Sequence, residues 1–252
     1  MADNTRLRGN RMKTQISWYG LFLIAGAFIG FFACLAAFLC EQHGKNEESK
    51  IKKLDILCGY LFQLLGMTLG AKLLYILTNP ASIRFDGLFG ILTFIFTGFS
   101  FYGAIFGGIG ALYLYCRIYK LSFSESLKIF IFSYPVIYGI ARVGCFLAGC
   151  CYGIPYTGVC CLMSPSGICR FPVQLLEVLL SFTVWVIMAV GKRKQRNAVK
   201  IFFLLHGLSR FFLEFLRDGG SKTMLGILSV NQWISILLIA GCLVRRGGKS
   251  VK

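Results

Sequence analysis

Three polar side chains recur every four residues in an otherwise apolar stretch: His206, Arg210 and Glu214 in IFFLLHGLSRFFLEFL. A four-residue spacing on an α-helix places all three on one face. An arginine fork can bind a phosphate or a carboxylate, a glutamate can orient that fork, and an imidazole can donate a hydrogen bond or accept a proton. The pattern indicates an anion-binding site with an acid–base group; an Arg–Glu pair that only joins helices is the alternative.

Arg142 is a second charged residue inside an apolar stretch, residues 131–149. A charge at bilayer depth is costly and typically faces a water-filled cavity or an anion, so Arg142 and Arg210 are both candidate anion-binding residues. Gly153, which follows this stretch, permits a turn that brings backbone close to a head group. Helix capping and packing are the simpler roles for the glycine.

Arg170, Gln174 and Glu177 lie around the start of the next apolar stretch, where Pro172 is placed to begin a helix. Gln174 and Glu177 are three residues apart and therefore share a helical face. We expect these side chains to form one wall of the same cavity. A hydrogen-bonded polar bracket at the membrane interface is the alternative.

Seven apolar stretches predict an all-α, polytopic integral membrane protein whose 252 residues form a single membrane domain. Residues 14–40 contain no charged side chain, and a bilayer crossing needs roughly 20 apolar residues. The small-x-x-x-small pairs Gly26/Gly30, Gly66/Gly70 and Gly103/Gly107 predict closely packed helices. The predicted spans are residues 17–40, 56–78, 92–116, 127–149, 173–191, 198–217 and 223–244.

The basic residues are distributed unevenly between the two sides of such a seven-span topology. Of 27 Lys and Arg, 16 lie in the loops 41–55, 117–128 and 192–200 and the C-terminus, and 8 on the other side. The bias predicts a cytoplasmic C-terminus and an external N-terminus. The net charge of +17 is concentrated in short loops between apolar stretches, so we expect an anionic membrane surface, and not nucleic acid, as the partner.

Six of the 11 cysteines lie between residues 145 and 169. Their spacing contains no C-x-x-C pair, which makes a zinc site a weak prediction, although thiolates from adjacent loops can assemble one. In an oxidising cell envelope, a disulfide such as one between the pairs 150/151 and 160/161 is permitted. Small buried thiols that pack as apolar side chains are the third interpretation.

Several segments, read in order, resemble the phosphatidylglycerol–prolipoprotein diacylglyceryl transferases of the bacterial plasma membrane. The similarity extends over the whole chain and includes a seven-span layout. The segments are ISWYGLFL, GFSFYGAIFGG, ARVGCFLAGCCYGIP, RFPVQLLE and LLHGLSRFFLEFLRD.

The resemblance implies transfer of a diacylglyceryl group from phosphatidylglycerol to the lipobox cysteine of a preprolipoprotein, in its signal-peptide region, with release of glycerol 1-phosphate. It implies that Arg142 and Arg210 bind the lipid phosphate, that Glu214 positions Arg210, and that Tyr19 and Gly153 occupy signature positions. Two guanidinium groups aimed at a phosphate ester stabilise charge as it develops on the leaving group. No cofactor and no metal are expected.

The chain departs from the family signature Gly-Arg-x-Gly-Asn-Phe-x-Asn-x-Glu. Cys145 and Ala148 stand at the two Asn positions, Cys150 at the Glu position, and Tyr102 where typical members have His. Because the attacking sulfur must be a thiolate, another group has to accept its proton. His206 is one candidate base. Cys150, as a covalent carrier of the lipid, is another.

Three functions fit these departures. The first is a divergent diacylglyceryl transferase. The second is a protein of the same fold that transfers another lipid-derived group or uses a metal at the cysteine cluster. The third is a membrane protein without catalytic activity, in which the arginines hold a lipid phosphate.

Overall fold

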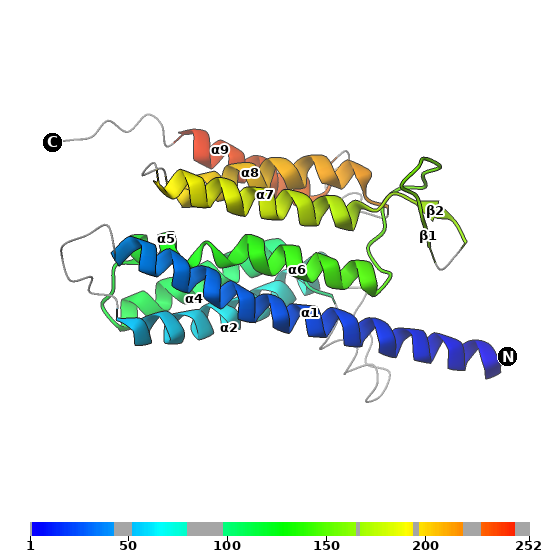
Figure 1. Cartoon of the computed structure of the whole chain (residues 1–252), viewed down its shortest axis with the longest axis horizontal. Coiled ribbons are helices and arrows are strands. Elements are labelled where there is room, and N and C mark those ends of the chain that lie inside the picture. The colour runs from blue at the N-terminus through cyan, green and yellow to red at the C-terminus, as the bar shows by residue number, and fades with distance from the viewer. Residues whose placement is uncertain are drawn as a thin grey trace. The chain divides into compact units, whose positions relative to one another are not determined.

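The computed structural model describes residues 2–42, 52–79, 98–164, 167–193, 197–218 and 228–244, with side chains from Trp18 onward in the first helix. These residues are almost entirely helical, which confirms the predicted all-α class (Figure 1). The chain divides into two compact units, residues 1–150 and 151–252. The predicted single domain stays a prediction.

The first unit contains five helices within the described ranges, and two close helix pairs hold it together. α2 packs against α4, and α1 packs against α6. The helices are α1 (Ala2–Gln42), α2 (Lys53–Thr78), α4 (Phe101–Ile118), α5 (Phe123–Phe130) and α6 (Ser133–Leu147).

Glycines make the contact between α2 and α4. A Cβ built on Gly66 would lie 2.4 Å from the carbonyl oxygen of Gly107, and one on Gly70 would lie 2.4 Å from that of Gly103. The two backbones therefore touch, as small residues at four-residue spacing allow in a membrane. This confirms the packing role predicted for these glycines.

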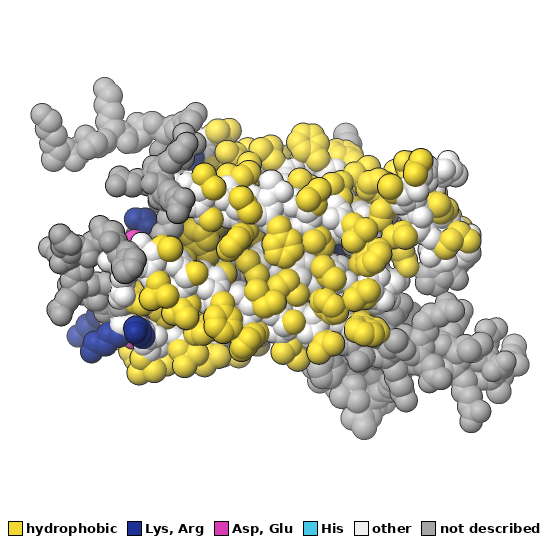
Figure 2. All heavy atoms as spheres, viewed as in Figure 1, with side chains coloured by type: hydrophobic (Ala, Val, Ile, Leu, Met, Phe, Trp, Pro, Cys, Tyr) yellow, Lys and Arg dark blue, Asp and Glu magenta, His cyan; other side chains and the backbone are white. Residues whose placement is uncertain are grey.

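Another face of α2 carries exposed leucines at four-residue intervals, among them Leu61, Leu65 and Leu69. A stripe of large apolar side chains along a whole helix is unfavourable in water but suits hydrocarbon. On the face that Figure 2 shows, hydrophobic side chains cover most of the described residues, and the visible Lys and Arg side chains lie toward the left-hand end of the view. The surface is that of a membrane protein.

Two predicted spans of the first unit differ from the observed helices. In the predicted span 92–116, residues 92–97 lie outside the described part. Residues 98–100 are not helical, because Gly98 has φ 70° and Ser100 is the extended residue before α4. The span predicted at 127–149 consists of α5 and α6, which are separated by a turn. Pro135 in the first turn of α6 has no N–H to donate to the carbonyl of Ile131, four residues earlier, so the hydrogen-bond ladder is not continuous through the turn.

The second unit contains three described α-helices and a short 3-10 helix: α7 (Val173–Arg193), α8 (Ala198–Leu213), η2 (Glu214–Leu216) and α9 (Val230–Val244). Asn197 caps α8 by accepting from the backbone N–H groups of Val199 and Lys200. Ser229 and Gln232 form a reciprocal capping box that starts α9 at Val230, seven residues after the predicted start of that span.

A small antiparallel hairpin precedes α7. Its strands β1 (Leu162–Met163) and β2 (Cys169–Arg170) are closed by a disulfide between Cys161 and Cys169, whose Cα atoms are 5.5 Å apart. The suggested pairing of 150/151 with 160/161 is therefore wrong. Strand pairing brings residues 161 and 169 within the Cα separation that a disulfide requires.

Five helices or helix pairs are long and apolar enough to cross a membrane: Trp18–Gln42, Lys53–Thr78, Phe101–Ile118, Phe123–Leu147 and Val173–Gly191. α9 is apolar but shorter, and α8 has 16 residues. The chain is thus a helical membrane protein, and the count of seven spans stays a prediction.

Candidate functional site

A buried ion-pair cluster in the second unit is centred on Arg210, near the C-terminal end of α8. Its Nη1 donates to Glu177 Oε1 on α7 at 2.8 Å, and its Nη2 lies 3.1 Å from Glu214 Oε2. Arg210 is 6% exposed, Glu177 1% and Glu214 8%. Removing one member would leave a buried charge uncompensated, so the cluster fixes the ends of α7 and α8 to each other and fixes the plane of the guanidinium.

Two further residues of this cluster were not predicted from the sequence. Asn231 on α9 donates to Glu214 Oε1 at 3.0 Å, and Arg217 Nη1 lies 3.7 Å from Glu177 Oε1. With Arg217 included, two arginines face two glutamates, and the formal charges balance. The position of Arg217, seven residues after Arg210, was an available signal; nothing in the sequence pattern singled out Asn231.

His206 and Gln174, two other predicted site residues of this unit, are both buried. The His206 ring stacks on Phe202 with centroids 5.3 Å apart and planes inclined by 11°. His206 and Arg210 thus follow one another along α8, and Glu214 is the next at the same four-residue spacing, at the first residue of η2. Gln174 lies on α7, one turn before Glu177.

Gly153 lies where the loop passes between the start of α7 and the end of η2. Its N–H donates to the carbonyl of Phe171 at 3.0 Å, and an added Cβ would meet the carbonyl oxygens of Phe171 and Leu216 at 2.7 Å each. Arg170 donates to the Gly153 carbonyl at 3.3 Å and forms an ion pair with Asp218. Close backbone approach therefore explains the glycine, and the predicted contact with a head group stays a prediction.

Arg142 in the first unit lies in a different environment. It is half-buried on α6, its guanidinium lies over the ring of Tyr138 at 4.9 Å, and its Nη1 is 3.9 Å from Cys145 Sγ. Tyr138 precedes Arg142 by four residues, so helical spacing was a signal that sequence reasoning missed. The ring attracts the cation through its negative face and fixes its direction.

Tyr19 on α1 lies beside this part of α6, since a Cβ on Gly144 would be 3.4 Å from the Tyr19 Cα. The Tyr19 ring packs against Phe99, over which the Lys72 amine lies at 4.5 Å. Tyr102, in the first turn of α4, is 1% exposed. The first unit thus brings Tyr19 to the turn of α6 that follows Arg142.

The predicted residues therefore fall into two groups. Arg210, Glu177 and Glu214 meet in the second unit, and Arg142, Cys145 and Cys150 lie together in the first. The joint action of both arginines on one anion stays a prediction. Each group holds a guanidinium in a fixed direction within a helical membrane protein, and binding of an anionic group by either arginine stays a prediction.

Comparison with known proteins identifies the family. The family model described as prolipoprotein diacylglyceryl transferase matches residues 10–245. The chain belongs to this family, and the predicted membrane transferase is confirmed.

Individual relatives match this chain over most of their own lengths. A phosphatidylglycerol–prolipoprotein diacylglyceryl transferase of Clostridium tetani is 35% identical over 185 residues, which cover 70% of this chain and 73% of the relative. A second, from Clostridium perfringens, is 29% identical over 209 residues (79% and 78%). A third, from Rickettsia rickettsii, is 28% identical over 238 residues (89% and 88%).

Proposed function

We propose that this protein transfers the diacylglyceryl group of phosphatidylglycerol to the cysteine thiol in the signal-peptide region of a prolipoprotein, in a bacterial plasma membrane. The observation that carries the proposal is the family match over residues 10–245, joined to two arginines in apolar helices whose guanidinium groups are held in fixed directions.

In the reaction, the acceptor sulfur attacks the glycerol carbon that bears the phosphate ester. The carbon–oxygen bond breaks, and glycerol 1-phosphate leaves with the bonding electrons. Arg142 and Arg210 bind the phosphate and stabilise the charge that develops on it. Glu177 and Glu214 keep the Arg210 guanidinium oriented, and His206 accepts the thiol proton.

The remaining predicted residues bind and position the substrates. Tyr19 and Tyr102 belong to the same unit as Arg142, and Gln174 belongs to the wall that contains Glu177. Gly153 and Arg170 keep the loop before α7 in place through the contacts described above.

The chain crosses the membrane seven times, with α8 and α9 as the sixth and seventh spans. The N-terminus is external and the C-terminus cytoplasmic. The Cys161–Cys169 disulfide supports this orientation, because its loop is then on the oxidising side of the membrane. An impermeant thiol reagent applied to intact cells should label Cys160 in this loop.

Complementation tests the activity. A bacterium depleted of its own prolipoprotein diacylglyceryl transferase should grow and process lipoproteins when it expresses this chain. Arg142→Gln should abolish rescue, while Arg117→Gln, at an exposed position of α4, should rescue like the unmodified chain at equal membrane abundance. Failure of the unmodified chain at that abundance would contradict the proposal.

A further inference from the structure

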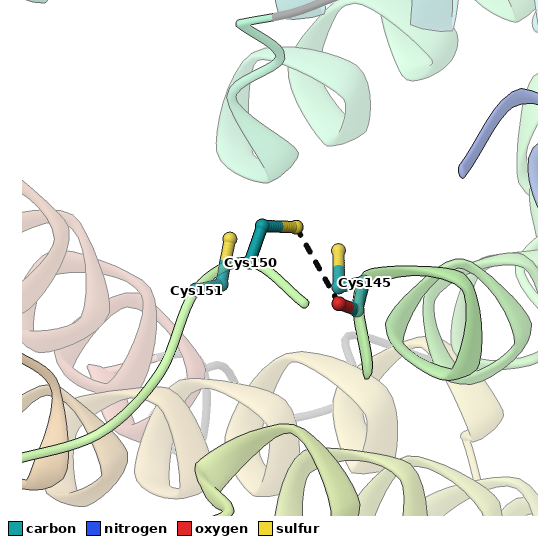
Figure 3. A group of neighbouring side chains, drawn as sticks. All are labelled: Cys145, Cys150 and Cys151. Atoms are coloured by element: carbon teal, nitrogen blue, oxygen red, sulfur yellow. Dashed lines mark hydrogen bonds between the residues drawn. The ribbon is translucent and has the colours of Figure 1, made fainter. Parts of the chain in front are cut away.

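Three cysteine side chains come together after α6, in a region where the family signature has other residue types. The sulfur atoms of Cys145, Cys150 and Cys151 all lie within 4.8 Å of one another. Figure 3 shows them on one short stretch of chain, with the Cys150 sulfur directed toward Cys145. Cys145 is buried, Cys150 half-buried and Cys151 exposed, so the group is open on one side.

The backbone at the end of α6 forces this proximity. The N–H of Cys150 donates to the carbonyl of Cys145 at 3.1 Å, and the N–H of Gly149 donates to that of Phe146 at 3.1 Å, with Gly149 at φ 65°. These bonds form a Schellman motif, which places the second residue after the C-cap against the third-last residue of the helix. In this chain both residues are cysteines, Cys150 and Cys145.

Cys151 joins the pair because it also has a left-handed backbone, with φ 60°. A non-glycine residue in this region is uncommon and unfavourable. All three thiols lie within seven consecutive residues, so their grouping depends only on the local path of the chain.

We infer that Cys145, Cys150 and Cys151 bind a zinc ion with an open fourth position, and that this position takes the acceptor thiol. Three protein ligands and one substrate position are the pattern of reactive zinc sites, and sulfurs around a zinc at about 2.3 Å are roughly 3.8 Å apart. The observed grouping within 4.8 Å needs a contraction of about 1 Å to reach that geometry.

Charge balance favours the same site. Three thiolates and one Zn²⁺ carry one net negative charge, and the guanidinium of Arg142, with Nη1 3.9 Å from Cys145 Sγ, neutralises it. Because Arg142 is also a proposed phosphate-binding residue, a thiol bound to this zinc lies close to one phosphate-binding group. The cluster therefore sits beside a residue of the proposed site.

This inference rests on the proposed function, since the transferred group needs a thiolate acceptor. A thiol bound to zinc is deprotonated, and His206 takes its proton in the proposed reaction. The bound sulfur attacks the glycerol carbon, glycerol 1-phosphate leaves with the electron pair, and the neutral thioether dissociates from zinc. Cys150 stands where the family signature has a glutamate, so no carboxylate is present there to activate the acceptor thiol. The zinc supplies that activation instead.

Metal content tests the site independently of activity. The full chain, purified in detergent with a phosphine reductant, should contain about one zinc per chain and develop thiolate-to-cadmium absorption when titrated with Cd²⁺. Cys145→Ser, Cys150→Ser and Cys151→Ser should each weaken cadmium binding at least tenfold. Cys160→Ser, an exposed cysteine of the next loop, should bind like the unmodified chain. Equal binding by all four variants, or absence of binding by the unmodified chain, would overturn the inference.

Activity of the same preparations separates this inference from the proposed function. Loss of transfer after zinc removal, with recovery when zinc is added back, supports both. Full transfer by metal-free protein overturns the catalytic role of zinc and leaves the proposed function intact. Zinc bound through the three cysteines without transfer, in any lipid mixture, supports the site and contradicts the proposed function.

Discussion

Arg210 and Glu177 are 33 residues apart in the sequence and form a buried ion pair, with 2.8 Å between Nη1 and Oε1. The pair joins α8 to α7, and Glu214 holds the other nitrogen of the same guanidinium. Such a cluster contributes little net stability relative to an apolar replacement, but its disruption is costly. Its presence in a membrane protein favours a role in directing the arginine.

Arg210→Gln should therefore destabilise the protein strongly. It leaves two buried glutamates facing Arg217 alone, and removing one partner of a buried pair costs about 3–5 kcal/mol. Thermal unfolding in detergent should show a large loss of stability for Arg210→Gln. The double variant Glu177→Gln, Arg210→Gln should lose less stability than the two single variants lose together. Additive losses would show that the two side chains are not coupled. Arg117→Gln is the exposed control.

Gly107→Ala should disrupt the contact between α2 and α4. An added Cβ would lie 2.2 Å from the carbonyl oxygen of Gly66, and forcing a methyl group into packed backbone costs about 1–3 kcal/mol. Gly110→Ala on the same helix is the matched control, because no atom lies within 4 Å of its built Cβ. Unfolding midpoints should fall for the first variant only; equal midpoints would contradict the observed packing.

Loss of the disulfide should destabilise the hairpin before α7. Closing a loop with a sequence separation of 8 residues contributes about 2–3 kcal/mol in the chain-entropy model. Cys161→Ser should lower the unfolding midpoint, whereas Cys160→Ser should leave it unchanged. Peptide mapping without reduction should recover the 161–169 link, and recovery of a 151–160 link would contradict the structure.

The aromatic ring of Tyr138 should be needed to orient the Arg142 guanidinium. Arg142 lies over that ring at 4.9 Å, and a cation–π contact contributes about 0.5–2 kcal/mol. Tyr138→Leu should lower transfer activity by roughly 2–30-fold at unchanged expression, since the guanidinium loses its orientation. Tyr138→Phe keeps the ring and should retain activity. Equal activity of the two variants would show that the ring does not position Arg142.

The parts of the fold that followed from the sequence are those set by local spacing. Apolar runs predicted α1, α2 and α7, and small residues at four-residue intervals predicted the contact of Gly66 and Gly70 with α4. Pro135, in the first turn of α6, was a local signal for the break between α5 and α6. The Ser229–Gln232 capping box likewise marked the start of α9.

The parts that did not follow depend on how distant segments meet. His206, Arg210 and Glu214 shared a face by spacing alone, but the partnership of Arg210 with Glu177 depends on the rotation of two helices about their axes. The disulfide depends on a hairpin of two-residue strands, too short to leave an alternating pattern. The thiol grouping of Cys145 with Cys150 is a local feature, because Gly149 directly follows the C-cap of α6 and closes the Schellman motif.

Isotope tracing of the lipid tests the central claim most directly. Purified protein in vesicles receives a lipobox peptide and phosphatidylglycerol labelled separately in its acyl chains and in its glycerol head group. The account predicts that the acyl label appears in a thioether-linked peptide while the head-group label is released in equal amount as glycerol phosphate, and that Arg142→Gln removes both. An unmodified peptide, with phosphatidylglycerol bound but not consumed, would contradict it.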